Sequence, residues 1–222
     1  TDATEKMRID SSGNVKIGSS TTGTPAANAD DLVIDKGASE SGITIISTAA
    51  SSLRFGDAAN TSIGSVEYNH NSNYMRFSTN NAERMRIDSS GDVGIGTTPE
   101  TAGPTWRTLF VGASAAIVSR QAAAGYDSMF ANNYYVNSSN QDRVRTTGPS
   151  SRMFLDGNNI RFQISPSTGA GGSPTWSEIM RIDDSGNVGI GTDSPLSPLT
   201  VKANTGGSAL RFIGRSDGIA GI

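Results

Sequence analysis

The sequence Glu83-Arg-Met-Arg-Ile-Asp-Ser-Ser-Gly-Asp-Val-Gly-Ile-Gly96 determines the fold that we predict for this chain. It occurs twice more, as Glu5-Lys-Met-Arg-Ile-Asp-Ser-Ser-Gly-Asn-Val-Lys-Ile-Gly18 and as Glu178-Ile-Met-Arg-Ile-Asp-Asp-Ser-Gly-Asn-Val-Gly-Ile-Gly191. Counted between their first Asp residues, the copies lie 78 and 95 residues apart. These intervals are too long and too unequal for leucine-rich, ankyrin or propeller repeats. Each interval therefore indicates a small module.

Each copy has the pattern of a β-hairpin. Met85 and Ile87 alternate with charged residues before the central turn, and Val93 and Ile95 alternate with Asp or Gly after it. In the turn itself, an Asp can accept hydrogen bonds from backbone N–H groups two residues on, and a Gly can adopt a positive φ. This is the chemistry of a type I turn followed by a left-handed residue. The predicted turn residues are Asp10, Gly13, Asp88, Gly91, Asp183 and Gly186.

The alternation gives every hairpin one apolar face and one polar face. A lone hairpin is marginally stable in water, so the apolar face must pack against something. Only 35% of the 222 residues are hydrophobic and 6% aromatic, which leaves few large side chains to cover it. We therefore expect burial between identical chains. The residues predicted on this face are Met7, Ile9, Val15, Ile17, Met85, Ile87, Val93, Ile95, Met180, Ile182, Val188 and Ile190.

Short apolar or β-branched segments also lie between the motifs, separated by Gly, Asn, Asp and Ser. They predict strands joined by tight turns, with little or no helix. The segments are 32–35, 43–46, 52–56, 63–68, 74–78, 109–112, 117–119, 159–164, 199–202 and 209–212. We expect the end of a first module at 1–19, a linker at 20–29, a second module at 30–97, a linker at 98–107, a third and longer module at 108–192, and the start of a fourth at 193–222.

The bulk composition argues against several classes of protein. The net charge is −3 and no basic stripe is present, which disfavours nucleic-acid and anionic-membrane binding. No apolar run approaches the ~20 residues of a membrane span, and the first residues do not resemble a signal peptide. The chain has no Cys, which is compatible with assembly in a reducing cytoplasm.

No group of residues predicts catalysis, a cofactor or a metal site. The Gly-rich stretch 91–96 is followed by Thr-Thr-Pro rather than by a helix, so it is not a dinucleotide fingerprint. The acidic turns lack the ligand order and the distal Glu of calcium loops. An ion held on the axis of a trimer by three symmetry-related turns is left open. Trp106 and Trp176 either stack on sugars or, as we favour, pack at module junctions.

The third module carries extra residues around 120–151 and 166–177. Insertions into a repeated frame usually emerge as surface loops, so this region is the first candidate for a lateral contact. The aromatic residues proposed for that contact are Tyr126, Phe130, Tyr134 and Tyr135.

The stretch Met85-Arg-Ile-Asp-Ser-Ser-Gly-Asp-Val-Gly-Ile-Gly-Thr-Thr-Pro99 resembles the recurrent motif of bacteriophage tail fibre and tailspike shafts. This resemblance implies an elongated, parallel homotrimeric fibre of β-modules that links the virion to a host-recognition tip. It also implies contacts with other phage tail or fibre proteins, an indirect relation to a host glycan or receptor, and a place in the virion after assembly in the bacterial cytoplasm. Two alternatives are a tailspike-type polysaccharide depolymerase and a lateral glycan-binding module. The near-identical repeats favour a structural protein over an enzyme.

Overall fold

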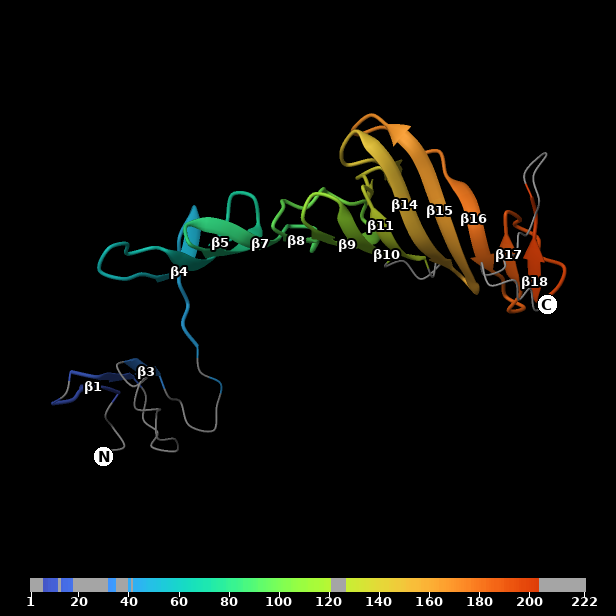
Figure 1. Cartoon of the computed structure of the whole chain (residues 1–222). Coiled ribbons are helices and arrows are strands. Elements are labelled where there is room, and N and C mark those ends of the chain that lie inside the picture. Colours follow the sequence, from blue (N-terminus) through green and yellow to red (C-terminus); the bar gives the residue numbers. More distant parts are fainter. Residues whose placement is uncertain are drawn as a thin grey trace, which may run out of the picture. The chain divides into compact units, whose positions relative to one another are not determined.

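The computed structural model describes residues 6–11, 13–17, 32–34, 40, 42–120 and 127–203 (Figure 1). Within these residues every regular element is a β-strand and none is a helix, which confirms the all-β prediction. The chain divides into two compact units, Thr1–Ile46 and Ser47–Ile222. Each unit is described by itself.

The first unit contains a three-stranded sheet in the order β1-β2-β3. Strands β1 (Met7–Ile9) and β2 (Val15–Ile17) form an antiparallel hairpin, and β3 (Leu32–Ile34) pairs with β2 in parallel. The strand predicted at 43–46 is not formed, and Ile46 is 89% exposed. A β-branched run becomes a strand only where a neighbouring strand supplies ladder partners, and sequence pattern alone does not provide them.

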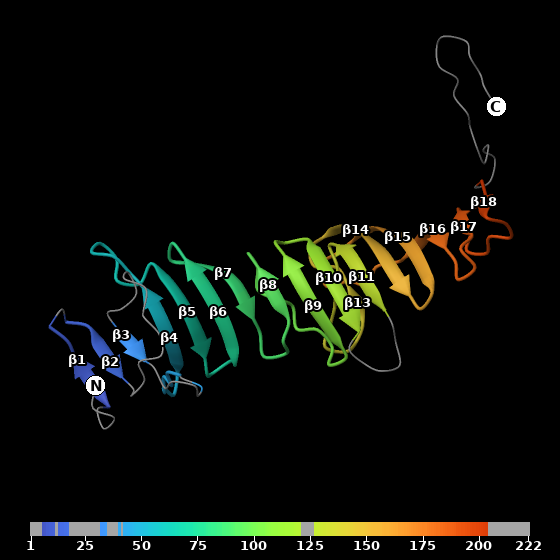
Figure 2. The ribbon, with the colours of Figure 1, turned by 90° about the horizontal axis from the view of Figure 1, so that it is seen from below.

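The second unit is built on one 13-stranded sheet in which spatial order follows chain order (Figure 2). Among the described strands of this unit, only the short pair β12 and β13 lies outside the large sheet, as a separate two-stranded sheet. The strands are β4 (Ala50–Phe55), β5 (Gly64–Asn69), β6 (Tyr74–Thr79), β7 (Ala82–Ile87), β8 (Val93–Ile95), β9 (Trp106–Val111), β10 (Ala115–Arg120), β11 (Ser128–Asn132), β12 (Tyr135–Val136), β13 (Asp142–Arg143), β14 (Gly148–Asp156), β15 (Asn159–Thr168), β16 (Ser177–Ile182), β17 (Val188–Ile190) and β18 (Leu199–Val201).

Each copy of the repeated motif forms the same three-stranded unit. The hairpins β1–β2, β7–β8 and β16–β17 are antiparallel, and β3, β9 and β18 then add in parallel. The register is also the same, because the Met of each first strand faces the last Ile of the second. The parallel third strand requires a crossover loop, and the hairpin pattern by itself does not predict one.

A glycine in the second motif strand allows this crossover loop to pass close to the sheet. A Cβ added to Gly94 would lie 2.2 Å from the Thr97 carbonyl oxygen and 2.9 Å from Cδ of Pro99. In the third copy a Cβ on Gly189 would lie 2.7 Å from the Thr192 carbonyl oxygen. The first copy carries Lys16 at the equivalent position.

The hydrophobic core lies on one side of the middle of the sheet. Trp106, Phe110, Val118 and Met129 point from β9, β10 and β11 to the same side, where Tyr134 covers them. We call this side the covered face, and the opposite side the open face. All buried hydrophobic residues of the described chain lie between positions 102 and 144, where they are Ala102, Trp106, Phe110, Ala116, Val118, Met129, Ala131, Tyr134, Val136 and Val144.

Replacing Gly94 by Ala should destabilise the second unit by about 1–3 kcal/mol, because the new methyl group overlaps the crossover loop. Urea titration followed by circular dichroism would measure the loss. Gly169→Ala is the matched control, since a Cβ there meets nothing within 4 Å. Equal stability of Gly94→Ala and Gly169→Ala would contradict the close packing of the loop.

Candidate functional site

The apolar residues of the motif hairpins belong to a continuous open face on the 13-stranded sheet. Ladder partners lie on the same side of a sheet, so the register identifies the members of each row. One row runs from Leu53 through Val66, Phe77 and Met85 to Ile95. A second and longer row crosses the third module. Its members are Met75, Ile87, Val93, Leu109, Ile117, Phe130, Met153, Phe162, Met180, Ile190 and Val201.

Nothing in the described chain covers these rows. Leu53 is 56% exposed and Phe130 is 52% exposed, although both are large apolar side chains in strands. None of the twelve residues predicted for the hairpin faces is buried, and those of the first unit include Met7 at 58% exposure. A contiguous exposed apolar surface on a soluble chain marks an interaction site. The open face is therefore the candidate functional site.

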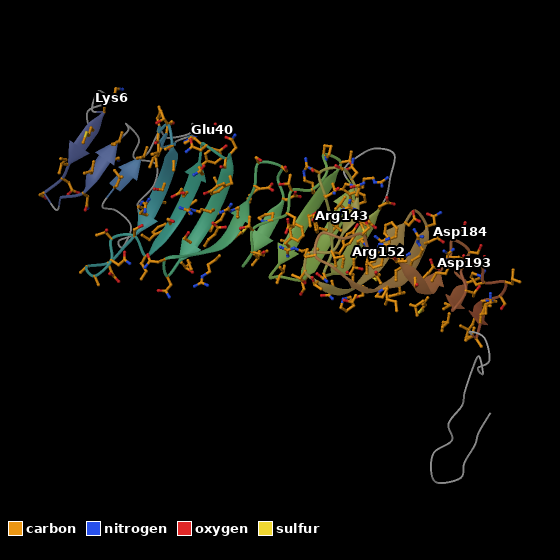
Figure 3. The ribbon with its side chains drawn as sticks, turned by 90° about the horizontal axis from the view of Figure 1, so that it is seen from above. Lys6, Glu40, Arg143, Arg152, Asp184 and Asp193 are labelled. Atoms are coloured by element: carbon orange, nitrogen blue, oxygen red, sulfur yellow. The ribbon has the colours of Figure 1, made fainter. Side chains whose placement is uncertain are left out.

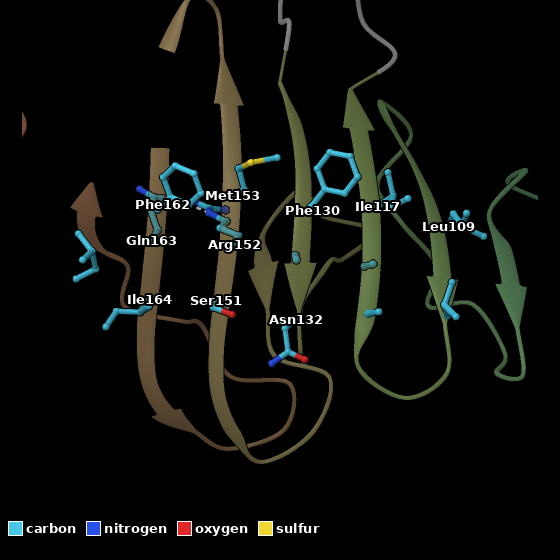
Figure 4. A pocket seen from close by; sticks show the side chains of 15 residues that line it. Leu109, Ile117, Phe130, Asn132, Ser151, Arg152, Met153, Phe162, Gln163 and Ile164 are labelled. Carbon is cyan, nitrogen blue, oxygen red and sulfur yellow. Dashed lines mark hydrogen bonds between the residues drawn. The ribbon is translucent and has the colours of Figure 1, made fainter. Parts of the chain in front are cut away.

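The open face is hollowed in the third module. A depression of ≈ 760 Å³ lies across β9, β10, β11, β14 and β15. Small or polar residues, Ala115, Asn132 and Ser151, lie side by side within it, whereas Phe130 and Phe162 rise from the neighbouring row (Figure 4). The lining is mainly apolar, so a partner here must present an apolar surface.

The turns place the predicted Asp and Gly residues as parts of one hydrogen-bonded loop. Oδ1 of Asp88 accepts from the N–H groups of Ser90 and Asp92, each at 2.9 Å. The Gly91 N–H donates to the Asp88 carbonyl at 3.0 Å, and Gly91 has φ = 85°. The same loop forms at Asp10 with Gly13 (φ = 90°) and at Asp183 with Gly186 (φ = 81°). Hydrogen bonding from the Asn187 backbone lowers the pKa of Asp183.

Asp92 has a structural role that sequence reasoning missed. It is fully buried, and its Oδ1 accepts from the Thr108 N–H at 2.7 Å while Oδ2 accepts from the Ala102 N–H at 3.2 Å. The carboxylate thereby joins the turn of the second motif to the crossover loop and to β9. Burial raises the pKa of Asp92 despite these two hydrogen bonds. The other two copies carry Asn at this position, which was the available signal that the Asp does something different.

The aromatic residues predicted for a lateral contact do not form one surface. Tyr134 is fully buried in the core, so the prediction that it contacts another molecule is wrong. Phe130 lies on the open face, opposite the core. Tyr135 is half-buried against the core, and Tyr126 lies outside the described residues. Of these residues, Tyr134 turns inward and packs with the core side chains of β9, β10 and β11.

A polar cluster lies beside this core. The carboxylate of Asp142 accepts from the Tyr134 hydroxyl at 2.7 Å, from Nε1 of Trp176 at 2.9 Å and from Nη1 of Arg152 at 3.0 Å. The Arg152 guanidinium also lies 4.1 Å from the centre of the Trp176 ring. Figure 3 marks the position of Arg152 in the third module. Burial and the nearby Asp142 raise the pKa of Tyr134, so its hydroxyl stays protonated as a donor. Trp176 is held inside the insertion.

The repeated Arg residues find their partners within the chain. Arg86 donates to Glu83 through Nε at 2.8 Å and Nη2 at 2.7 Å, and Arg181 contacts Glu178 in the same two-point manner. Hydrogen bonding to the Glu raises the pKa of each Arg. These pairs neutralise charges on the polar side of the second and third motifs.

The described residues contain neither a group of three metal-ligating side chains nor a helix long and apolar enough to cross a membrane. No protein-family model matches the chain, and no curated protein sequence matches it either.

Asp92 should give the stability of the second unit a distinct pH dependence. Its ordinary pKa is 3.8, and burial raises it in the folded chain. Between those two pKa values the folded state binds more protons than the unfolded state, so the contribution of Asp92 to the free energy of unfolding falls as pH rises. Urea titrations of the wild type and Asp92→Asn from pH 3 to 7 would measure it.

The difference in free energy of unfolding, wild type minus Asp92→Asn, is expected to decrease as pH rises above 3.8. Asp184→Asn, the same change of a carboxylate to an amide at an exposed position of the third motif, is the control variant. If the free energy of unfolding of Asp92→Asn followed pH in parallel with that of the wild type, the result would contradict the raised pKa of Asp92.

Proposed function

We propose that this chain is a shaft segment of a bacteriophage tail fibre, and that three parallel copies assemble through their open faces. The observation that carries the proposal is the uncovered apolar face that continues across the 13-stranded sheet. Leaving apolar surface in water costs about 25 cal/mol per Å². Residues such as Leu53, Phe130 and Leu199, all more than half exposed, therefore favour association strongly.

The geometry of the face favours a second copy of the same chain as the partner. Within each row, neighbouring side chains lie one strand spacing of ~4.8 Å apart, so a surface with the same spacing can match a row over its whole length. Another copy of this chain has that spacing and the same apolar rows. A parallel arrangement in register also matches the hollow of the third module with an identical module.

The number of copies comes from the resemblance to phage shaft repeats, and closure about an axis is consistent with it. Three sheets with their open faces inward would enclose a common apolar centre and leave the covered faces and the insertion outside. Cyclic symmetry of this kind makes every copy equivalent along a rod. The proposed role of the segment is structural rather than catalytic, and it needs no cofactor.

The proposed role is to connect the virion with a host-recognition tip. Its partners are other copies of itself and the neighbouring tail or fibre proteins, with a host glycan or receptor contacted only indirectly. Assembly takes place in the bacterial cytoplasm and the product resides in the virion. The motif that resembles phage shafts, in three copies with one common hydrogen-bonding pattern, supports this role.

The purified chain should have three times its 23.0 kDa mass in size-exclusion chromatography with light scattering. Small-angle scattering should give an elongated particle. A stable monomer at micromolar concentration would overturn the assembly proposal, and a stable dimer would overturn the trimer while keeping the open face as the interface. Conversion of an open-face residue, Phe130→Asp, should lower the associated fraction.

A further inference from the structure

We infer that chains first recognise one another through the open face of the third module, from Leu109 on β9 to Ile164 on β15, and that the partner is a second copy of this chain. The rest of the sheet joins afterwards. This inference rests on the proposed assembly and adds an order of events and a specific surface. It follows from a difference between the modules in what lies behind their open faces.

Behind the open face of the third module lies a core built by the chain itself. Phe110, Val118 and Met129 are at most 1% exposed, and each lies in a strand that also contributes to the open face. A single chain therefore holds β9, β10 and β11 in place through buried apolar contacts. Their open-face side chains are already arrayed before any partner arrives.

Polar contacts fasten the insertion over this core. The Arg145 side chain is largely buried, donates to the Gly112 carbonyl at 2.9 Å and to Oγ1 of Thr97 at 3.0 Å, and lies 4.5 Å from the centre of the Phe110 ring. The Asp142 cluster anchors the other part of the insertion. Hydrogen bonds of this kind, made in a buried setting, tie the insertion to the strands beneath it.

The second module has no comparable support. Strands β4, β5, β6 and β7 contribute no buried hydrophobic residue. Behind their open face lie ion pairs, such as Arg76 with Glu67 at 2.8 Å and Arg86 with Glu83 at 2.7 Å. An ion pair is weak evidence for stability, whether it is partly exposed as Arg86 with Glu83 or has one buried partner as Arg76 with Glu67. These strands lack the contacts that would hold their apolar row in shape in an isolated chain.

Preorganisation decides which surface docks first. A face that is already ordered loses less conformational entropy on association than one that must be ordered at the same time. The third-module face is also the wider one, because β14 and β15 have 9 and 10 residues whereas β4–β7 have 6 each. Its hollow and its exposed Phe130 and Phe162 give a second copy a shaped apolar surface to match.

The two Trp residues of the chain allow the order of events to be measured. Trp106 is buried in the core and Trp176 packs against it, so intrinsic fluorescence reports on this region alone. On dilution of the full chain from urea, the Trp signal should change in a phase whose rate does not depend on protein concentration. Light scattering should rise later, at a rate that increases with concentration.

The repeat supplies a matched pair of variants for the docking surface. Phe77 and Phe162 each follow an Arg, each pair with a motif Met across the ladder, and each precede a register shift. Phe162→Asp should slow association by about tenfold. Phe77→Asp, the same change in the module without a core, should slow it by less than about twofold.

The possible results distinguish failure of the inferred order of assembly from failure of the assembly proposal itself. Equal slowing by both variants, or a Trp phase whose rate depends on concentration, would overturn the inference while leaving the assembly proposal intact. A wild-type chain that never associates would overturn both. The Trp fluorescence of Phe162→Asp before association shows whether the core of this variant has formed. If that fluorescence change is lost, the milder variant Phe162→Ser is measured instead. A folded Phe162 variant that associates as fast as the wild type would also overturn the inference.

Discussion

The register of the motif hairpin is the constraint on which the remaining structure depends. The Asp88 carboxylate fixes it by accepting from two backbone N–H groups of the turn, and Gly91 closes the loop with a positive φ. Because side chains alternate along a strand, a slip of one residue would exchange the two faces. The turn therefore places Met85, Ile87, Val93 and Ile95 on one side of the sheet. The equivalent turns of the other two copies do the same for their apolar residues.

The covered face and the open face of the sheet differ in whether the chain itself provides partners for their side chains. On the covered face the charges are neutralised locally by pairs such as Glu83 with Arg86, or the face is buried beneath the insertion. On the open face the apolar rows remain in water. The chain thus completes one side of its structure internally, while no described residue covers the apolar rows on the other side. The insertion marks the one region where internal completion produces a true core.

Local patterns predicted the strands and turns well, because both depend on neighbours in sequence. The alternation around Asp88 and Gly91 is of this kind. The parallel third strand and the role of Gly94 were not predicted, since they depend on where a loop of about ten residues returns. The repeated Gly-x-Gly-Thr and the Pro after it were the only signals.

Burial was harder to predict than secondary structure. Tyr134 and Phe130 looked alike as aromatic residues within an insertion, yet one is fully buried and the other is on the open face. Their difference is decided by strand pairing and by the path of the loop after β11. The extended segment 43–46 shows the converse, since a strongly β-branched sequence formed no strand there.

The strictly sequential strand order has a mechanical consequence. A pull along the direction in which β4 to β18 follow one another loads the ladders in series, so the shortest ladder carries the same force as the longest. The ladders β7–β8 and β8–β9 have three residue pairs each, whereas β14–β15 has eight. Under tension the sheet would separate first at the three-pair ladders of the motifs, whereas the longer ladders from β9 to β16 would hold.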